Sequence, residues 1–373
     1  MVLNIKHLNK FLEINTELIQ DIEFKDIVDK QINGVFSDFE TSDTIDNDPF
    51  FKFYFVTDFN SCWDSKSYYQ SMGEAHHYGG KFKLYAHGAQ MVVDTNQHIP
   101  TIYYLIKNNT KNDLSYRIKN SAFASHTETQ INIFYYRVFL VFIQWYNLTQ
   151  NSSFVHASSV AYRGNAYLLS ATSGIGKSSF LMAISQDPDF SFIADDLTIL
   201  NKAGNAFFLG RKISVKPYHL FYFPWLRGII MKIMPPMQKV QWKLFSKTKK
   251  LGIGLPFSSL FISGSKSDIK VKKIFHLINH NKDEFEAIEF NADDLARISN
   301  AILQTEMFLG LEFFSQINYF NIKTYFSTDT KLADVTLSVL RDIFKNVEIE
   351  GVLVPYRSNP NDLADFIKKR INI

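Results

Sequence analysis

The chain has 373 residues, of which 46% are hydrophobic and 21% are charged, so a packed core is expected in one elaborated domain or in two. Its net charge of +3 points to no particular partner, and nucleic acid is not expected as one. The single cysteine, Cys62, excludes an internal disulfide framework and any zinc site built from several cysteines.

The N-terminal segment MVLNIKHLNKFLEINTELIQ is polar and helix-like, and it shows no signal-peptide pattern. The most apolar run, IFYYRVFLVFIQWYNL, contains Arg137 and Gln144 and falls short of a membrane span. A reducing, cytoplasmic location is therefore the expected one.

Residues 1–150 are expected to form an N-terminal α+β region, to which the sequence assigns no role. One or two helices are predicted over residues 1–48, which end in a polar, turn-rich segment. Strands separated by Asn, Gly and Asp turns are predicted at 50–59, 80–95 and 99–108. The long apolar segment 131–150 has mixed spacing, which favours a buried helix over a strand.

Residues 151–335 are expected to form a second domain of the α/β class. Two hairpins are predicted there, with turns at 163–165 and 202–205. Between them lie a loop, an apolar helix and a strand that ends in Asp195 and Asp196. Antiparallel elements, and not a plain βαβ series, are thus expected on both sides of the loop.

The loop follows an apolar strand in the segment YLLSATSGIGKSSFLMAI, residues 167–184. Its end matches the phosphate-loop pattern G-x-x-x-x-G-K-[ST]. Glycines at 174 and 176 permit close approach of backbone N–H groups to phosphate oxygens, and the following helix N-terminus adds partial positive charge. The pattern predicts that Lys177 binds the β- and γ-phosphates of a nucleotide and that Ser178 is a Mg²⁺ ligand.

One position departs from this pattern, because Ala171 stands where the first glycine belongs. An alanine is compatible with the loop if its φ stays negative. The alternative interpretation is a strand-to-helix turn of small residues that contains Gly-Lys-Ser by chance. The apolar strand before the loop and the apolar helix after it favour the phosphate loop.

Charge is distributed unevenly along the chain. Residues 1–60 carry 12 acidic and 5 basic side chains, whereas the stretch between Asp196 and Asp268 has 12 basic side chains and no acidic one. Such a bias favours an anionic partner, such as an acidic substrate, near the basic stretch. The alternative is a solvated basic face that the acidic N-terminal segment balances.

A basic, aromatic insert is expected at about residues 217–262, where prolines interrupt the sequence YHLFYFPWLRGIIMKIMPPMQKVQWKLF. It is consistent with a mobile lid, a peptide-binding surface or a peripheral membrane contact. Helices packed on the core with their lysines outside are the preferred interpretation. Further strands are predicted at 269–278, 285–290 and 320–327, and helices at 291–311, 332–344 and 360–371. Residues 336–373 are expected to pack on the core as a C-terminal helical segment.

Three short motifs occur in a fixed order: VHAS at 155–158, SGIGKSS at 173–179 and ADD at 194–196. This order resembles that of the HPr kinase/phosphorylase family and its kinase-like relatives, whose nucleotide core is similar to that of phosphoenolpyruvate carboxykinases. The likeness covers residues 153–216 and continues more weakly to about 330. It implies an α/β fold with a carboxykinase-like P-loop core and a mixed, partly antiparallel sheet.

The resemblance also implies roles for individual residues. Asp195 and Asp196 share Mg²⁺ binding and general-base duty, with Asp196 the expected metal ligand beside Ser178. His156 corresponds to a family histidine close to the reacting phosphate. The region after Asp196 lacks the E-x-R-G signature of phosphorolysis, so the likeness is closer to the kinase-like relatives. The nucleotide phosphates are assigned to Ser173, Gly174, Ile175, Gly176, Lys177, Ser178 and Ser179.

The expected function is an ATP-dependent kinase that uses Mg²⁺ to transfer the γ-phosphoryl group to a hydroxyl of a peptide, a protein or a small molecule. Homo-oligomerisation is compatible with the sequence. One alternative is a P-loop NTPase or nucleotide-gated binding module that lacks a phosphate acceptor. Another is a non-catalytic scaffold with a degenerate loop, which Ala171 favours slightly and which Lys177, Ser178 and the aspartate pair oppose.

Overall fold

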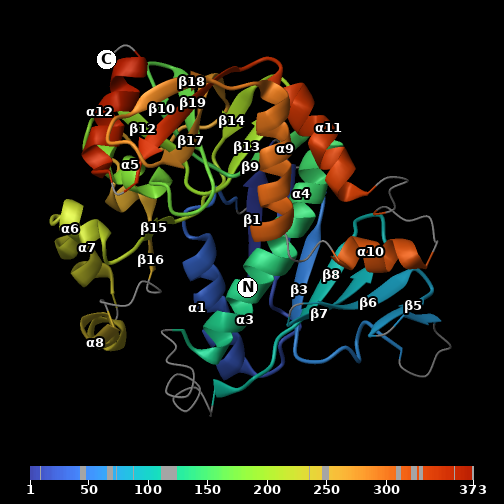
Figure 1. Ribbon diagram of the computed structural model, residues 1–373. Helices are drawn as coiled ribbons and strands as arrows, with labels where there is room; N and C mark the ends of the chain where they lie inside the picture. The colour runs from blue at the N-terminus through green and yellow to red at the C-terminus, as the bar shows by residue number, and fades with distance from the viewer. Residues whose placement is uncertain are drawn as a thin grey trace. The chain divides into compact units, whose positions relative to one another are not determined.

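The chain folds into two compact units that both combine helices with sheets (Figure 1). Unit 1 comprises Met1–Tyr146 and Gln304–Val335, and unit 2 comprises Asn147–Leu303 and Thr336–Ile373. Residues 304–335 therefore group with the N-terminal unit and not with residues 151–303. The computed structural model describes residues 1–8, 10–42, 48–64, 70–72, 74–86, 88–110, 124–234, 236–245, 252–307, 312–320, 326, 331–356 and 358–371.

Unit 1 contains an eight-stranded sheet in the order β1-β2-β3-β8-β7-β6-β5-β4. Its strands are β1 (Val2–His7), β2 (Lys10–Asn15), β3 (Lys52–Val56), β4 (Gln70–Met72), β5 (Ala75–Tyr78), β6 (Lys81–Ala86), β7 (Ala89–Asp94) and β8 (Thr101–Leu105). Strand β3 pairs in parallel with β2 and β8, and the other neighbouring strands are antiparallel. The helices are α1 (Ile22–Phe36), α3 (His126–Ile133), the π-helix η2 (Phe134–Phe139), most of α4 (Leu140–Thr149), most of the π-helix η4 (Leu303–Met307) and α10 (Glu312–Tyr319).

Phenylalanine rings fill the core of unit 1. The Phe53 and Phe55 rings of β3 lie 5.5 and 4.7 Å from that of Phe134 in η2, measured between centroids. Phe36 of α1 lies 4.9 Å from Phe139 of the same π-helix, in an edge-on arrangement. Edge-on aromatic pairs of this kind stabilise a core beyond the area that they bury. The buried helix expected over 131–150 is thus confirmed.

The expectation of a helix at the very N-terminus was wrong, because Val2–His7 and Lys10–Asn15 are the antiparallel strands β1 and β2. In β2 the buried side chains begin with Leu12 and Ile14, two residues apart, which is the period of a strand. The polar residues of this N-terminal segment gave it the composition that led to the helix prediction. The helix of this region is α1, which begins after the N-cap Asp21, whose side chain accepts a hydrogen bond from the Phe24 amide.

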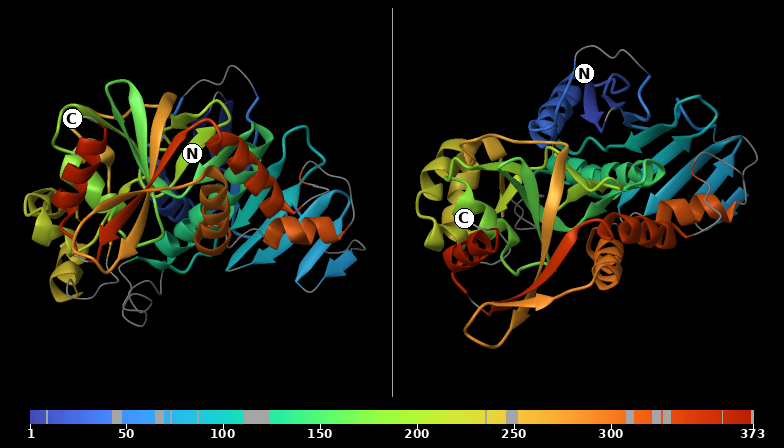
Figure 2. Two further views of the ribbon diagram at one scale, coloured as in Figure 1. Left: turned by 45° about the horizontal axis from the view of Figure 1, so that its top comes forward. Right: turned by 90° about the horizontal axis from the view of Figure 1, so that it is seen from above.

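Unit 2 is built on a nine-stranded sheet in which the long strand β17 branches. Strands β12-β10-β11-β17 follow one another, and β17 then pairs with both β19 and β14. β17 and β19 run side by side in parallel (Figure 2). The strands are β9 (Ser152–Val155), β10 (Ala157–Tyr162), β11 (Asn165–Ser170), β12 (Phe190–Ala194), β13 (Thr198–Asn201), β14 (Asn205–Phe207), β17 (Ile269–His280), β18 (Glu286–Glu289) and β19 (Glu348–Pro355).

Both hairpins predicted from the sequence are confirmed as the antiparallel pairs β10–β11 and β13–β14. The first strand of the earlier hairpin, β10, is separated at His156 from β9, since β9 pairs with β13 whereas β10 pairs with β11 and β12. The chain is therefore a mixed α/β protein whose sheets combine parallel and antiparallel strands.

Helices and a small ribbon complete unit 2. The helices are α5 (Lys177–Ile184), α6 (His219–Tyr222), α7 (Leu226–Ile233), α8 (Pro236–Phe245), the 3-10 turn η3 (Phe257–Ser259), α9 (Ala292–Ile302), α11 (Leu332–Phe344) and α12 (Pro360–Arg370). The two-stranded ribbon consists of β15 (Ile213–Val215) and β16 (Ile253–Leu255).

Helices α6, α7 and α8 make up most of the described part of the insert, as the preferred interpretation expected, and strand β16 follows them. Helix α7 buries Leu226 and Ile230 completely. The helices expected at 332–344 and 360–371 are also confirmed. The strand predicted at 320–327 lies outside the described residues except for Phe320 and Phe326. Among the described residues, no helix combines the length and the apolar character that crossing a bilayer requires.

Gly351 offers a test of this sheet. It lies in β19 opposite Ile288 of β18, and a Cβ atom there would approach Ile288 Cγ1 to 2.6 Å. Gly351→Ala is expected to lower the free energy of unfolding by about 1–3 kcal/mol, because the close-packed neighbours must shift. Urea or thermal unfolding measures the change.

Gly228→Ala is the matched control, because a Cβ atom at this position of α7 meets nothing within 4 Å. Alanine there is expected to stabilise the protein by up to about 1 kcal/mol through helix propensity. Equal unfolding midpoints for the two variants would contradict the packing at Gly351.

Candidate functional site

Strand pairing brings the predicted motifs to one edge of the sheet in unit 2. β10 lies between β11 and β12 and runs antiparallel to both, so the carboxyl ends of β11 and β12 meet at the same edge. The loop at 171–176 follows β11, the aspartate pair follows β12, and β10 begins beside them with Ala157 opposite Ser170. Motifs that are 17 to 40 residues apart in sequence thus become neighbours.

The loop takes the backbone shape that its glycines allow. Gly174 and Gly176 have φ angles of 91° and 116°, a region that side chains disfavour. Gly176 is the N-cap residue of α5, and its carbonyl accepts the Phe180 amide at 2.8 Å. Residues 172–174 are exposed to solvent. The loop therefore presents its backbone outward at a helix N-terminus, where anions bind favourably.

Lys177 lies beneath this loop with only 6% of its surface exposed. Its ammonium donates to the carbonyls of Ala171 and Thr172 at 2.8 and 3.1 Å. Ala171 is fully buried and is not among the residues with positive φ, so no glycine is required at its position. The ammonium thus stabilises the first turn of the loop, and an alanine is compatible with position 171.

Asp195 is the buried carboxylate of the site and is 1% exposed. Its oxygens accept hydrogen bonds from Ser158 Oγ at 2.7 Å, from Ser178 Oγ at 3.0 and 3.1 Å, and from the Ser214 amide at 3.2 Å. Burial raises the pKa of Asp195 above its ordinary value, and the adjacent Asp196 carboxylate raises it further. The hydrogen bonds that Asp195 accepts from Ser158 and Ser214 lower its pKa and so oppose both effects.

Asp196 has a different environment, although it is the next residue. Its Oδ2 lies 2.7 Å from Arg211 Nη1 and its Oδ1 lies 2.6 Å from His156 Nε2, while 32% of its side chain is exposed. Partial burial would raise its pKa, but Arg211 and then His156 outweigh burial and hold the pKa well below the ordinary range. Asp196 is therefore ionised at neutral pH and faces outward.

Asp196 was the expected metal ligand beside Ser178, whereas Ser178 Oγ bonds to Asp195. The physical reason is the end of β12: Asp195 continues the strand inward toward α5, and Asp196 turns away with a positive φ of 69°. Among the described residues no group of three His, Cys, Asp or Glu side chains could hold a metal by itself. Ser178 and Asp195 still offer the oxygen ligands that Mg²⁺ prefers alongside water and phosphate.

Ser179 was expected to contact phosphate, but its side chain is buried and bonded to His219 Nε2 at 3.0 Å. The Lys216 amide donates to the other ring nitrogen, Nδ1, so Nε2 carries the proton and donates to Ser179. Burial, followed by the charge of Lys216, lowers the pKa of His219 to about 3. This histidine is neutral and joins α5 to the start of the insert.

Sequence reasoning missed three residues of this site. Arg211 and Ser158 contact the aspartates, and His276 lies on β17 opposite Ser170 at the end of β11. Burial, with a further contribution from Lys177, lowers the pKa of His276 to about 4. Strand and turn residues of these types carry no local signal, because their partners come from other segments of the chain.

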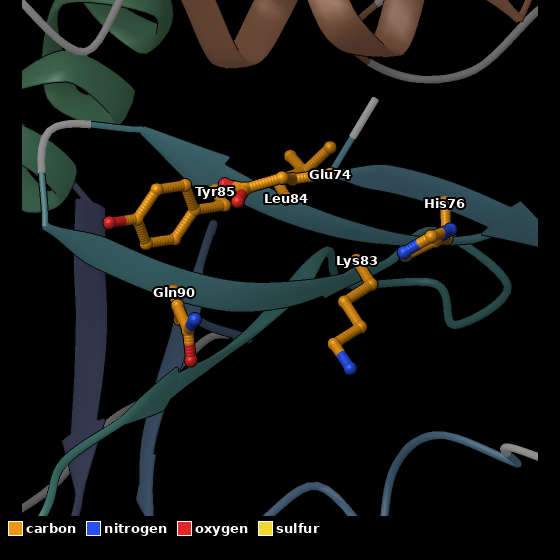
Figure 3. Close-up of a pocket in the computed structure, with 6 residues that line it drawn as sticks. All are labelled: Glu74, His76, Lys83, Leu84, Tyr85 and Gln90. Carbon is orange, nitrogen blue, oxygen red and sulfur yellow. The ribbon is translucent and has the colours of Figure 1, made fainter. Parts of the chain in front are cut away.

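Unit 1 has a pocket of its own. It is open to solvent and has a volume of about 310 Å³ (Figure 3). The pocket shares no residue with the loop or the aspartate pair. It is lined by Glu74, His76, Lys83, Leu84, Tyr85 and Gln90. The residues to which the sequence assigns chemistry lie in unit 2 and not in this pocket.

No family model and no curated protein matches the chain. The resemblance to the HPr kinase/phosphorylase family therefore stays a prediction. A function for the chain has to be inferred from the geometry around the loop at 171–178 and the aspartate pair.

The ion pair between Arg211 and Asp196 generates a prediction. In Arg211→Ala the pKa of Asp196 is expected to rise toward the ordinary value of about 3.9, because the largest opposing charge is lost. A depressed pKa adds stability above about pH 4 that is lost as the pH falls toward the folded value. The variant should therefore lose less stability than the wild type below pH 4.

Carboxyl carbon-13 NMR titration, with Asp196→Asn to assign the resonance, measures this pKa directly. Arg227→Ala removes an exposed arginine of the same unit and serves as the control. An Asp196 pKa that is the same in both arginine variants would rule out the ion pair.

Proposed function

We propose that the chain is an ATP-dependent, Mg²⁺-assisted phosphotransferase with a carboxykinase-like P-loop core, which transfers the γ-phosphoryl group to a hydroxyl. The observation that carries this proposal is the contact of Ser178, the residue after the loop lysine, with the buried carboxylate of Asp195. A hydroxyl at a helix N-terminus that meets a carboxylate at the end of a neighbouring strand is the pairing that P-loop enzymes use at a metal.

In this proposal the phosphates lie over residues 173–178, at the N-terminus of α5. The positive φ of Gly174 and Gly176 lets backbone N–H groups turn toward the anion. The Lys177 ammonium, which donates to the carbonyl oxygens of Ala171 and Thr172, gains a stronger, charged acceptor in the phosphate. Ser178 and Asp195 hold Mg²⁺, which when bound neutralises charge on the β- and γ-phosphates.

Asp196 is assigned to the hydroxyl that accepts the phosphoryl group. Its ionised, partly exposed carboxylate accepts a hydrogen bond from the substrate hydroxyl and orients its oxygen for attack. A loose transition state needs little proton removal before the bond from the γ-phosphorus to the ADP oxygen breaks, so a weak base suffices. The hydroxyl proton passes to the Asp196 carboxylate as the new oxygen–phosphorus bond forms and ADP leaves. His156 fixes the other carboxylate oxygen, and Arg211 supplies positive charge beside the transferred group.

Lys177→Ala tests the phosphate assignment. Phosphoryl transfer is expected to fall by about 100-fold or more, because an ammonium that stabilises developing charge is removed. The measurement uses γ-labelled ATP and fractions of cell lysate, with the label followed to an acceptor or to free phosphate.

Lys272→Ala, which changes an exposed lysine of β17, is the matched control, and circular dichroism verifies that both variants fold. Unchanged transfer in Lys177→Ala refutes the proposal. Label that ends only as free phosphate would replace the phosphotransferase with a hydrolase.

Substitution of the two aspartates should affect different steps, nucleotide binding for Asp195 and phosphoryl transfer for Asp196. Asp195→Asn is expected to abolish the Mg²⁺-dependent part of nucleotide affinity, since a metal ligand loses its charge. Asp196→Asn should leave nucleotide affinity within about threefold but reduce transfer by roughly 10²–10⁴. Titration calorimetry with and without Mg²⁺, together with the label assay, measures both effects.

Asp189→Asn, at an exposed carboxylate between α5 and β12, provides the control. If Asp195→Asn keeps its full response to Mg²⁺ while Asp196→Asn loses it, the two aspartates have exchanged roles and Asp195 is not the metal ligand.

A further inference from the structure

The insert of unit 2 exposes aromatic and basic side chains together. Helices α6 and α7 lie at the rim of this unit beside α5 (Figures 1 and 2). Phe221 is 81% exposed, Tyr218 48% and Trp225 37%, and Arg227 and Lys232, which follow them in the chain, are also exposed. We call these five residues the aromatic–basic surface.

This surface is presented by an ordered support. Helix α7 buries Leu226 and Ile230 on one side. Trp225, Ile229 and Lys232 are spaced by four and three residues, so they share one side of the helix, which lies next to the buried side. The bond between His219 of α6 and Ser179 of α5 fastens the start of the insert to the loop helix.

The charge of this segment identifies the kind of partner. Between Asp196 and Asp268 the chain has 12 basic residues and no acidic one, so no acidic neighbour in sequence balances Arg227 and Lys232. A group of exposed apolar side chains marks a contact surface, and the surrounding positive charge attracts an anionic partner. The partner must therefore have both an apolar region that aromatic side chains can enter and negative charge.

An anionic bilayer meets both requirements better than a peptide does. A side chain that is 81% exposed projects from the protein, whereas peptide anchors fit into grooves that bury the receptor's own apolar side chains. Tryptophan, tyrosine and phenylalanine partition to the boundary between headgroups and acyl chains, and lysine and arginine bind lipid phosphates. Amphipathic helices with both kinds of side chain lie in the plane of that boundary.

We propose that the aromatic–basic surface docks the protein on membranes that contain anionic phospholipids. Phe221 and Trp225 enter the headgroup boundary, and Arg227 and Lys232 contact lipid phosphates. This docking does not depend on the proposed phosphotransfer, and it is measured without nucleotide. Its failure would therefore leave the phosphotransferase proposal untouched.

Sedimentation with vesicles tests the docking. The full chain is expected to bind vesicles of 70% phosphatidylcholine and 30% phosphatidylglycerol, and to bind pure phosphatidylcholine far more weakly. Arg227→Gln/Lys232→Gln should lower the partition coefficient on the order of twentyfold, since each basic residue near an anionic surface contributes about fivefold. Phe221→Ala/Trp225→Ala should lower it by about tenfold or more.

Matched controls change equally exposed residues elsewhere in unit 2: Lys272→Gln/Lys369→Gln for charge and Tyr356→Ala for apolar surface. These controls should bind as the wild type does, and circular dichroism verifies the fold of every variant. The proposal is overturned if binding does not depend on the phosphatidylglycerol content. It is also overturned if the controls and the test variants lose vesicle binding equally. Binding to poly-L-glutamate without binding to vesicles overturns it as well, because that result would assign the surface to an acidic peptide.

Discussion

The burial of one carboxylate organises the site. A buried charge is costly unless hydrogen bonds replace the water that it loses. Asp195 obtains these bonds from Ser158 at the start of β10, Ser178 in the first turn of α5 and the Ser214 amide in β15. Three segments that are distant in sequence are thereby tied to the end of β12, and the loop is held in register with the sheet.

The neighbouring carboxylate, Asp196, shows how the environment shifts the pKa values of two identical side chains in opposite directions. Asp195 is enclosed by neutral donors, so burial raises its pKa, whereas Asp196 faces Arg211 and His156, which lower its pKa. Two titrating groups whose environments push their pKa values apart are a common basis for divided roles in catalysis. The positive φ of Asp196 turns it away from Asp195 and makes this division possible.

The departure at the first glycine of the loop has a structural explanation. Positive φ angles occur at Gly174 and Gly176, and the position of Ala171 is buried with ordinary backbone geometry. The Lys177 ammonium bonds to the Ala171 carbonyl, and a backbone oxygen is the same in alanine and glycine. The methyl group of Ala171 therefore packs in the core without altering the contacts of the loop.

Local patterns in the sequence determined the parts of this protein that depend on neighbouring residues: the hairpin turns at 163–165 and 202–205, the apolar strand before the loop, its glycines, and the helices α11 and α12. The N-terminal hairpin was missed because its polar composition hides a period of two. Only the tertiary structure decided that Ser178 meets Asp195 and that Arg211 meets Asp196, because those contacts join different elements and loops of the unit. Contacts across a sheet depend on strand order and register, which pairing and burial determine over the whole unit and no short segment encodes.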